Sequence, residues 1–194
     1  PVKPNTIAAF ENVQTLSRYL RSKTYTLGTA FEVRPQLFKR RIRQTSKVES
    51  IVDEFDGETI ADELAHLDAN QKILSQQEFD IFIAFSNEIP TALQEIGRLR
   101  EITYRSVGEG TNKSTDLDQF DLYYHHLILW DRNAKKIAGA YRVGKGNDIR
   151  NKYGNRGFYI NSLFRFDRKF SNILNQSLEL GRSFVTEEYQ MKRL

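Results

Sequence analysis

The 194-residue sequence predicts an α/β (α+β) fold, with a mixed central sheet that is flanked by helices and preceded by a helical arm. Apolar residues recur at helical spacing in some segments and alternate at strand spacing in others. Their order along the chain is helix, two strands, helix, hairpin, strand, short helix and final strand. Hydrophobic residues make up 39% of the chain, which is enough apolar material for a buried core.

Residues 1–57 are predicted to form a helical arm or linker. Apolar residues near its start fall on one helix face: Phe10, Val13, Leu16 and Leu20. A proline and the basic cluster KRRIR around Arg40 follow this helix. Such a run could contact phosphates or anionic headgroups, although a solvated helix face is the commoner explanation. It has no interleaved aromatic residues and no nucleic-acid-binding motif, so nucleic acid is not a predicted partner.

Residues 58–194 are predicted to form the globular domain. The segment ETIADELAHLDANQ places Ile60, Leu64 and Leu67 on one helix face, and this helix is expected to end near Asn70. The next segment is predicted to be strand, because apolar residues alternate along it: Phe79, Ile81, Ile83 and Phe85.

The clearest helix prediction begins at Pro90 and stops at Gly108, with an apolar stripe of Leu93, Ile96, Leu99 and Ile102. The segments HHLILWD and IAGAYRVGKG are predicted to pair as a hairpin. Next come RGFYINSLFRFD as a strand or ordered loop, FSNILNQ as a helical turn, and LELGRSFV as the final strand. Because the sequence stops at MKRL directly after a strand, we expect a C-terminally truncated fragment of a longer protein.

Composition narrows the possible functions. The net charge of +4 favours acidic partners, which include nucleic acid, anionic lipid, phosphorylated cofactors and acidic carrier proteins. The absence of cysteine excludes disulfides, a thiol nucleophile and cysteine-ligated metal sites, and no metal site is predicted. The start has no signal-peptide layout, and the run FDIFIAF is far shorter than the roughly 20 residues that cross a bilayer. We therefore expect a cytoplasmic protein, which in one alternative lies against the inner membrane.

Two short motifs have simple structural explanations. HLILWD fits the His-x4-Asp signature of glycerolipid acyltransferases, but residues five apart in a strand face opposite sides and lie about 16 Å apart. His126 and Asp131 therefore cannot touch, and Asp131 is expected to be a turn residue. RVGKG resembles a phosphate-binding glycine loop, but no helix start is evident after it, so a hairpin exit is favoured. Arg142 shares the side of the strand that carries Ala138 and Ala140, which leave room beside it.

The charged pair in LELGRSFV is the most informative feature. An unpaired charge in a buried strand is costly, so Glu179 and Arg182 must pair, reach water or do chemistry. They have opposite parity in a regular strand, whereas one bulge at Gly181 would bring both to the same face. Asp118 and Asp121 in DLDQFD are a second candidate, either for contact with an amine or for helix capping.

Several segments together resemble one bacterial family over about residues 90 to 190: LREITYRSVGEG, DLDQFDLYYHHLILWD, IAGAYRV, GFYINSLFRFD and LELGRSFV. The family joins ornithine-lipid and glycine-lipid N-acyltransferases to acyl-homoserine-lactone synthases; its members have the GNAT fold and are often labelled hemolysins. The opening PVKP…FENVQTLSRYLRSKTYTLG resembles the tail of a glycerolipid acyltransferase domain, which implies that the arm belongs to a preceding acyltransferase domain.

The resemblance implies an N-acyltransferase that moves a fatty acyl group from an acyl carrier protein or acyl-CoA thioester to a primary amine such as an amino acid. Neither co-substrate is expected to be held as a tightly bound cofactor. The implied catalytic residues are Glu179, Arg182 and Asp121. The implied substrate-binding residues are Arg100, Tyr104, Asp118, His126 and Arg142.

Physical chemistry is consistent with this implied reaction. Attack on a thioester needs a neutral amine, for which Glu179 is a candidate base, and a bulged strand can offer an amide to the oxyanion. TEEYQMKRL has no glycine-rich pyrophosphate loop, which favours the carrier protein as donor. Ile160, Asn161 and Ser162 stand where the ornithine-lipid enzymes have an acidic residue, which argues against ornithine and leaves a smaller amine such as glycine open.

A rival hypothesis is a non-catalytic module that binds a carrier protein or membrane and assists an upstream acyltransferase domain. Catalysis requires Glu179, Arg182 and Arg142 to converge in one cleft, which a binding module does not. A third hypothesis, a pore-forming toxin, is not supported, because the sequence contains no amphipathic membrane-inserting segment.

Overall fold

The computed structural model divides into two compact units, residues 1–47 and 48–194. The parts of the chain that it describes are residues 4–8, 10, 12–25, 48–164, 166 and 170–190. In the first unit, α1 (Pro4–Ile7) precedes α2 (Val13–Tyr25). The Asn12 side chain accepts a hydrogen bond from the Thr15 amide at 2.9 Å and so caps α2. The basic cluster around Arg40 lies outside the described residues.

Residues 48–56 belong to the second unit, whereas the sequence placed the boundary between residues 57 and 58. The Glu49 amide donates to the Asn112 carbonyl at 3.0 Å, and the Val52 amide donates to the Ser114 carbonyl at 3.3 Å. These main-chain bonds attach the segment to a loop some sixty residues later. Hydrophobic spacing alone contains no signal for such bonds.

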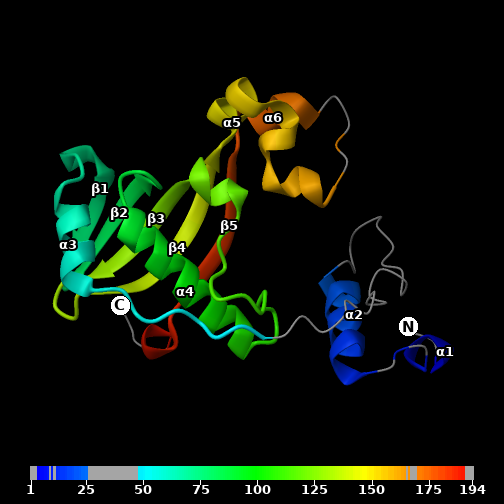
Figure 1. Cartoon of the computed structure of the whole chain (residues 1–194). Coiled ribbons are helices and arrows are strands. Elements are labelled where there is room, and N and C mark those ends of the chain that lie inside the picture. The colour runs from blue at the N-terminus through cyan, green and yellow to red at the C-terminus, as the bar shows by residue number, and fades with distance from the viewer. Residues whose placement is uncertain are drawn as a thin grey trace. The chain divides into compact units, whose positions relative to one another are not determined.

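The second unit is built on a five-stranded sheet in the order β1-β2-β3-β4-β5, with every neighbouring pair antiparallel. Its strands are β1 (Lys72–Gln76), β2 (Phe79–Phe85), β3 (His125–Asp131), β4 (Lys136–Lys145) and β5 (Leu178–Val185). Figure 1 shows the strands side by side, with β5 at the edge away from β1. The predicted α/β architecture, with a sheet flanked by helices, is confirmed, but the sheet is antiparallel throughout rather than mixed.

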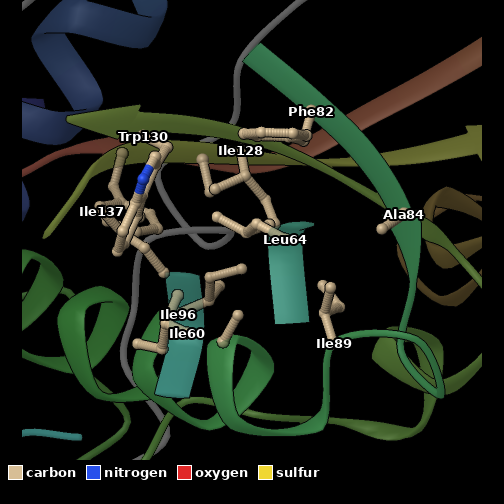
Figure 2. Packing of buried hydrophobic residues seen from close by; sticks show 12 residues of the cluster. Ile60, Leu64, Phe82, Ala84, Ile89, Ile96, Ile128, Trp130 and Ile137 are labelled. Atoms are coloured by element: carbon tan, nitrogen blue, oxygen red, sulfur yellow. The ribbon is translucent and has the colours of Figure 1, made fainter. Parts of the chain in front are cut away.

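Two helices, α3 (Gly57–Ala65) and α4 (Pro90–Ser106), pack their apolar residues against one face of the sheet (Figure 1). Ile60 and Leu64 of α3 and Ile96 of α4 meet Ile128 and Trp130 of β3 in this core (Figure 2). Burial of apolar surface at about 25 cal/mol per Å² makes this contact the main stabilising term of the domain. The predicted stripe of α4 is buried at Leu93 and Ile96 but reaches the surface at Ile102.

A single carboxylate joins α3 to α4. Glu63 of α3 accepts hydrogen bonds from the backbone amides of Thr91, at 2.7 Å, and Ala92, at 2.9 Å. These amides belong to the first turn of α4, where no partner exists within the helix. Helix α3 itself ends at Ala65, earlier than the predicted Asn70, because the chain leaves the α-helical path and forms the 3₁₀ turn η2 (Ala69–Gln71).

A short helical insertion connects β4 to β5 (Figure 1). Its described elements are α5 (Gly146–Tyr153), η4 (Gly154–Gly157), η5 (Tyr159–Ser162) and α6 (Ser171–Asn175). The prediction that no helix starts after RVGKG is wrong, because α5 begins at Gly146. The segment GNDIRNKY has too few apolar residues to show helical spacing. The predicted strand or ordered loop around residue 160 is the 3₁₀ turn η5.

The remaining described elements are η3 (Gln119–Leu122), which precedes β3, and η7 (Glu187–Tyr189), which follows β5. Among the helices in the described ranges, none combines the length and apolar character that a bilayer-spanning segment requires.

Candidate active site

Strand β5 carries a bulge where it pairs with β4. Arg142 of β4 lies opposite Gly181, and Ala140 lies opposite Phe184, so two steps along β4 correspond to three along β5. The extra residue follows Gly181, and Arg182 adopts a left-handed backbone conformation with φ of 51°. Such a conformation is strained for a residue other than glycine, and strained residues cluster at functional sites.

The predicted bulge is therefore present, but one residue later than expected. Gly181 is not in the left-handed region, and the conformational strain falls on Arg182 instead. The Tyr104 hydroxyl of α4 donates a 2.9 Å hydrogen bond to the Ser183 carbonyl, which helps to hold this irregular backbone. As a result, Glu179 and Arg182 project from the same side of β5 despite their spacing of three residues.

Arg100, on α4, is at the centre of a buried ion-pair network. Its Nη1 lies 2.8 Å from Asp121 Oδ1, its Nη2 lies 3.3 Å from Asp121 Oδ2, and its Nε lies 3.3 Å from Asp116 Oδ2. Arg100 and Asp121 are each only 1% exposed. Burial alone would raise the pKa of Asp121, but hydrogen bonds and charge from Arg100 and Arg142 outweigh burial and lower it. Asp121 is therefore ionised at neutral pH.

Arg142, on β4, extends the network towards the helical insertion. Its Nη1 lies 2.6 Å from Asp118 Oδ1 and 3.3 Å from Asp121 Oδ1. Its guanidinium carbon lies 5.2–5.5 Å from the ring centres of Phe120, Tyr124 and Tyr159. Aromatic faces attract a cation at this distance, so the buried charge is stabilised by both carboxylates and rings. The predicted room beside Arg142 is thus filled by aromatic side chains.

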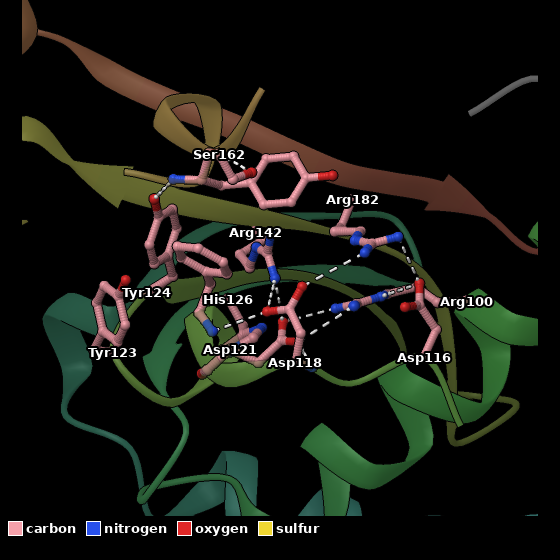
Figure 3. A network of polar contacts seen from close by, with 12 residues as sticks. Arg100, Asp116, Asp118, Asp121, Tyr123, Tyr124, His126, Arg142, Ser162 and Arg182 are labelled. Carbon is pink, nitrogen blue, oxygen red and sulfur yellow. Dashed lines mark hydrogen bonds and ion pairs between the residues drawn. The ribbon is translucent and has the colours of Figure 1, made fainter. Parts of the chain in front are cut away.

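Arg182 completes what we call the arginine–aspartate network, which consists of Arg100, Arg142, Arg182, Asp116, Asp118 and Asp121 (Figure 3). Its Nη1 lies 3.1 Å from Asp116 Oδ2, and its Nη2 lies 3.5 Å from Asp118 Oδ2. Three positive and three negative side chains balance, which keeps the burial of so many charges tolerable. The Arg182 side chain is 24% exposed, whereas those of Arg100 and Arg142 are almost fully buried.

An open hollow of about 420 Å³ adjoins the network. It is lined by Tyr104, Glu109, Tyr159, Arg182 and Ser183. Arg182 is the member of the network that lines this hollow, and Ser183 contributes from the bulge. The arrangement places a partly exposed guanidinium beside irregular strand backbone, which suits recognition of an anionic group next to a reacting carbonyl.

Comparison with known proteins agrees with this arrangement of a bulged strand and helices. Residues 99–194, which include the network and the bulge, match the family described as "Acetyltransferase (GNAT) domain". The matched stretch covers just under half of the chain, and over it the chain is similar to a GNAT acetyltransferase domain. No solved structure matches the chain.

Two curated relatives extend the match beyond the GNAT domain family. A protein of Bacteroides thetaiotaomicron named glycine N(alpha)-acyltransferase is 36% identical over 151 residues, which cover 75% of this chain and 44% of that protein. A protein of the same name from Phocaeicola vulgatus is 33% identical over 151 residues, covering 75% of this chain and 46% of that protein. The chain therefore spans less than half the length of these curated relatives.

Glu179 of β5 does not pair with Arg182. Its carboxylate accepts hydrogen bonds from the backbone amides of Tyr159, at 3.2 Å, and Ile160, at 2.7 Å, and from the Tyr124 hydroxyl. Burial, and next the hydrogen bond to Glu179, raise the pKa of Tyr124, so its phenol keeps the proton that it donates. Within the part of the chain that the structure describes, the Glu179 carboxylate is held by hydrogen bonds rather than by a cation.

His126 lies behind the network, and its Nε2 is 3.0 Å from the Asp121 carbonyl oxygen. Burial lowers the pKa of His126, so the imidazole is neutral at pH 7. Asp131 accepts hydrogen bonds from the amides of Asn133 and Ala134 in the turn between β3 and β4, each at 2.9 Å. Asp131 is the last residue of β3 rather than a turn residue, but its carboxylate holds the turn that follows, and it lies five residues along the strand from His126.

The structure brings most of the predicted site residues together. Five of them belong to the network: Arg100, Asp118, Asp121, Arg142 and Arg182. Tyr104 lines the hollow, whereas Glu179 and His126 contact residues beside it. The roles assigned to these residues in substrate binding and catalysis remain predictions.

Sequence reasoning missed Asp116, Tyr124 and Tyr159. Asp116 opens the motif DLDQFD and was available as a third acidic residue of that loop. Tyr124 and Tyr159 carry no comparable signal, because their contacts with Glu179 join segments 55 and 20 residues apart.

Proposed function

We propose that this protein transfers a fatty acyl group from a thioester to the primary amine of a small amino acid, with glycine as the favoured acceptor and an amide-linked lipid or lipid precursor as product. The observation that carries the proposal is the hollow beside the bulged strand, where Arg182 is the exposed end of a charge-balanced network. The GNAT match supports acyl transfer. The relatives' names support an amino-acid acceptor.

A zwitterionic amino acid suits this hollow. Its carboxylate would meet the Arg182 guanidinium, which retains exposed surface beyond its contacts with Asp116 and Asp118. Because the charges of the network already cancel, a ligand without net charge adds no uncompensated charge to the site.

The reaction needs no redox step. The ammonium group of the bound zwitterion first loses one proton to solvent; the resulting neutral amine attacks the thioester carbonyl carbon, a C–N bond forms, and the C–S bond breaks. The nitrogen loses one proton, and the departing thiolate takes one up. Residues 182 and 183, at the bulge, depart from regular strand pairing, which is one way to direct a backbone amide at the developing oxyanion.

The donor in this proposal is an acyl carrier protein. Carrier proteins that bear acyl thioesters are acidic, and the net charge of +4 favours association with them. The segment after β5 has no glycine for a pyrophosphate loop, which supports a carrier-protein thioester over acyl-CoA. Peripheral contact with the inner membrane is a further expectation, since the product is an amphiphile.

The test is an acyl-transfer assay with purified protein, an acyl carrier protein thioester or the matching acyl-CoA, and a panel of amines. Mass spectrometry of the amide product identifies donor and acceptor together. We expect N-acylglycine from the wild type, and a loss of at least about 100-fold in kcat/KM for Arg182→Ala, which removes a charge-assisted contact to the acceptor.

Arg156→Ala is the matched control, because Arg156 is an exposed arginine on η4 and does not line the hollow. It should retain wild-type kinetics. Absence of amide product from folded wild-type protein with every donor and acceptor would overturn the proposal. Carrier-protein binding without turnover would instead favour the accessory-module hypothesis.

A further inference from the structure

Tyr159 lies at the junction between the hollow and the network. Its ring centre is 5.8 Å from the guanidinium carbon of Arg182 and 5.2 Å from that of Arg142. It also meets the Phe120 ring edge to face, with 5.4 Å between ring centres. Because Tyr159 and Arg182 both line the hollow, the Tyr159 ring covers one side of the Arg182 guanidinium at the edge of the open space.

Glu179 holds the backbone of Tyr159 in place. The amides of Tyr159 and Ile160 both donate to the Glu179 carboxylate, and the Tyr159 amide also donates to the Tyr124 hydroxyl oxygen at 3.0 Å. Ser162 closes the turn by donating from its hydroxyl to the Tyr159 carbonyl at 2.6 Å (Figure 3). Hydrogen bonds from backbone amides to a carboxylate are roughly twice as strong as neutral ones.

These contacts occupy three of the roughly four acceptor sites of the Glu179 carboxylate. One oxygen accepts from Tyr124 and Tyr159, and the other accepts from Ile160. Glu179 is also absent from the residues that line the hollow. A general base must reach the proton that it removes, either directly or through one water, whereas these contacts direct Glu179 at the turn.

We propose that Glu179 and Tyr124 are positioning residues that hold the turn of η5, and that Tyr159 is thereby fixed over Arg182 as a specificity-determining wall for an acceptor that carries a carboxylate. The inference rests on the proposed function. The ring of Tyr159 limits access of water to Arg182, and a shielded guanidinium attracts a carboxylate more strongly than a solvated one. The substrate class is therefore an α-amino acid rather than a simple amine.

Two substitutions test the positioning role. Glu179→Gln replaces an acceptor-only carboxylate with a group that must present NH₂ to one of the same donors. We expect KM for glycine to rise at least 5-fold, kcat to change less than 3-fold, and the pH profile to keep its shape. Tyr124→Phe should shift KM in the same direction. If Glu179 is instead the base, kcat falls by about 100-fold or more and the acidic limb of the pH profile is lost.

Two substitutions of Tyr159 test the specificity role, with glycine and glycinamide as paired acceptors. Tyr159→Ala should lower the preference for glycine over glycinamide at least 10-fold, and Tyr159→Phe should restore it, because the hydroxyl of Tyr159 donates no hydrogen bond within the described residues. Tyr141→Phe is the matched control, since Tyr141 is an exposed tyrosine of β4 outside the hollow. An unchanged preference in Tyr159→Ala would overturn the specificity role.

Hydrogen exchange separates this inference from the proposed function, because it needs no activity. In Glu179→Gln the amides of residues 159 and 160 should exchange at least 10-fold faster than in the wild type, while those of the core strand β3 keep their protection. Unchanged exchange would overturn the positioning role even in an active enzyme. A wild-type protein that acylates no amine would refute the proposed function. The hydrogen-exchange result would still test whether Glu179 holds the turn.

Discussion

Arg100 and Asp121 face each other through two hydrogen bonds, of 2.8 and 3.3 Å, in a place where neither side chain reaches water. Arg100 belongs to α4, whereas Asp121 belongs to η3, 21 residues later. The pair therefore fixes the acidic loop against the long helix and sets the position of the whole arginine–aspartate network.

Asp121→Asn should destabilise the domain by about 3–5 kcal/mol, because it leaves a buried guanidinium with a neutral partner. Urea or guanidinium titration measures the change in the free energy of unfolding. Asp53→Asn is the control, since Asp53 is exposed, and it should change that free energy by less than about 0.5 kcal/mol. Equal effects of the two substitutions would contradict a structural role for the pair.

Because His126 is buried, we expect the free energy of unfolding of the domain to decline below neutral pH. The pKa of this histidine is lowered in the folded protein by burial, and the charged groups that face it include Asp121, Arg100 and Arg142. The unfolded chain takes up a proton as pH falls through its ordinary pKa of about 6.5, whereas the folded protein resists protonation. The stabilising contribution is thus complete above that pH and is lost as pH falls towards the folded pKa.

Denaturation at pH 7.5 and pH 5.5 measures this effect. One histidine contributes a slope of at most about 1.4 kcal/mol per pH unit in the window. His126→Gln should reduce the slope, because it removes the buried imidazole. His125 is also buried with a lowered pKa, so a residual slope should remain in His126→Gln.

Gly181→Ala should be tolerated, despite the position of Gly181 next to the bulge. A methyl group there would meet no heavy atom within 4 Å among the described residues, and the backbone is not left-handed. The expected change in the free energy of unfolding is within about 1 kcal/mol and of stabilising sign, because alanine restricts the unfolded chain.

Gly146→Ala is the contrasting substitution. Its new methyl carbon would lie 1.8 Å from the Leu174 carbonyl oxygen and 2.8 Å from that of Ser177, so α5 and α6 would have to separate. We expect a loss of about 2 kcal/mol or more in the free energy of unfolding. A strongly destabilising Gly181→Ala would contradict the open space at that position, and a neutral Gly146→Ala would contradict the close contact of α5 with α6.

Glu63→Ala should cost about 1–2 kcal/mol in the free energy of unfolding, because it removes the acceptor for two amides of the first turn of α4. Glu58→Ala, on the same helix, removes only an exposed ion pair with Lys135. Its cost should stay below about 1 kcal/mol. Thermal or chemical denaturation of both variants side by side distinguishes the cap from a general effect of removing a glutamate from α3.

Elements with regular spacing could be predicted from the sequence. The stripe after Pro90 predicted α4, and the alternation from Phe79 to Phe85 predicted β2, because burial against one face imposes a period on the residues. Helix α5 could not be predicted in this way. It contributes little apolar surface beyond the buried Ile149, and its start at Gly146 depends on close contact with Leu174.

In the candidate site, too, some features could be predicted from the sequence and others could not. From the sequence alone it could be predicted that Glu179 and Arg182, charged residues in an otherwise apolar strand, need partners or water, because an unpaired charge in such a place is costly. The identity of the partners became known from the fold: Arg182 contacts Asp116 and Asp118, while Glu179 contacts the turn at Tyr159. Side-chain pairing depends on distances between segments that are far apart in the chain, and periodicity carries no information about those distances.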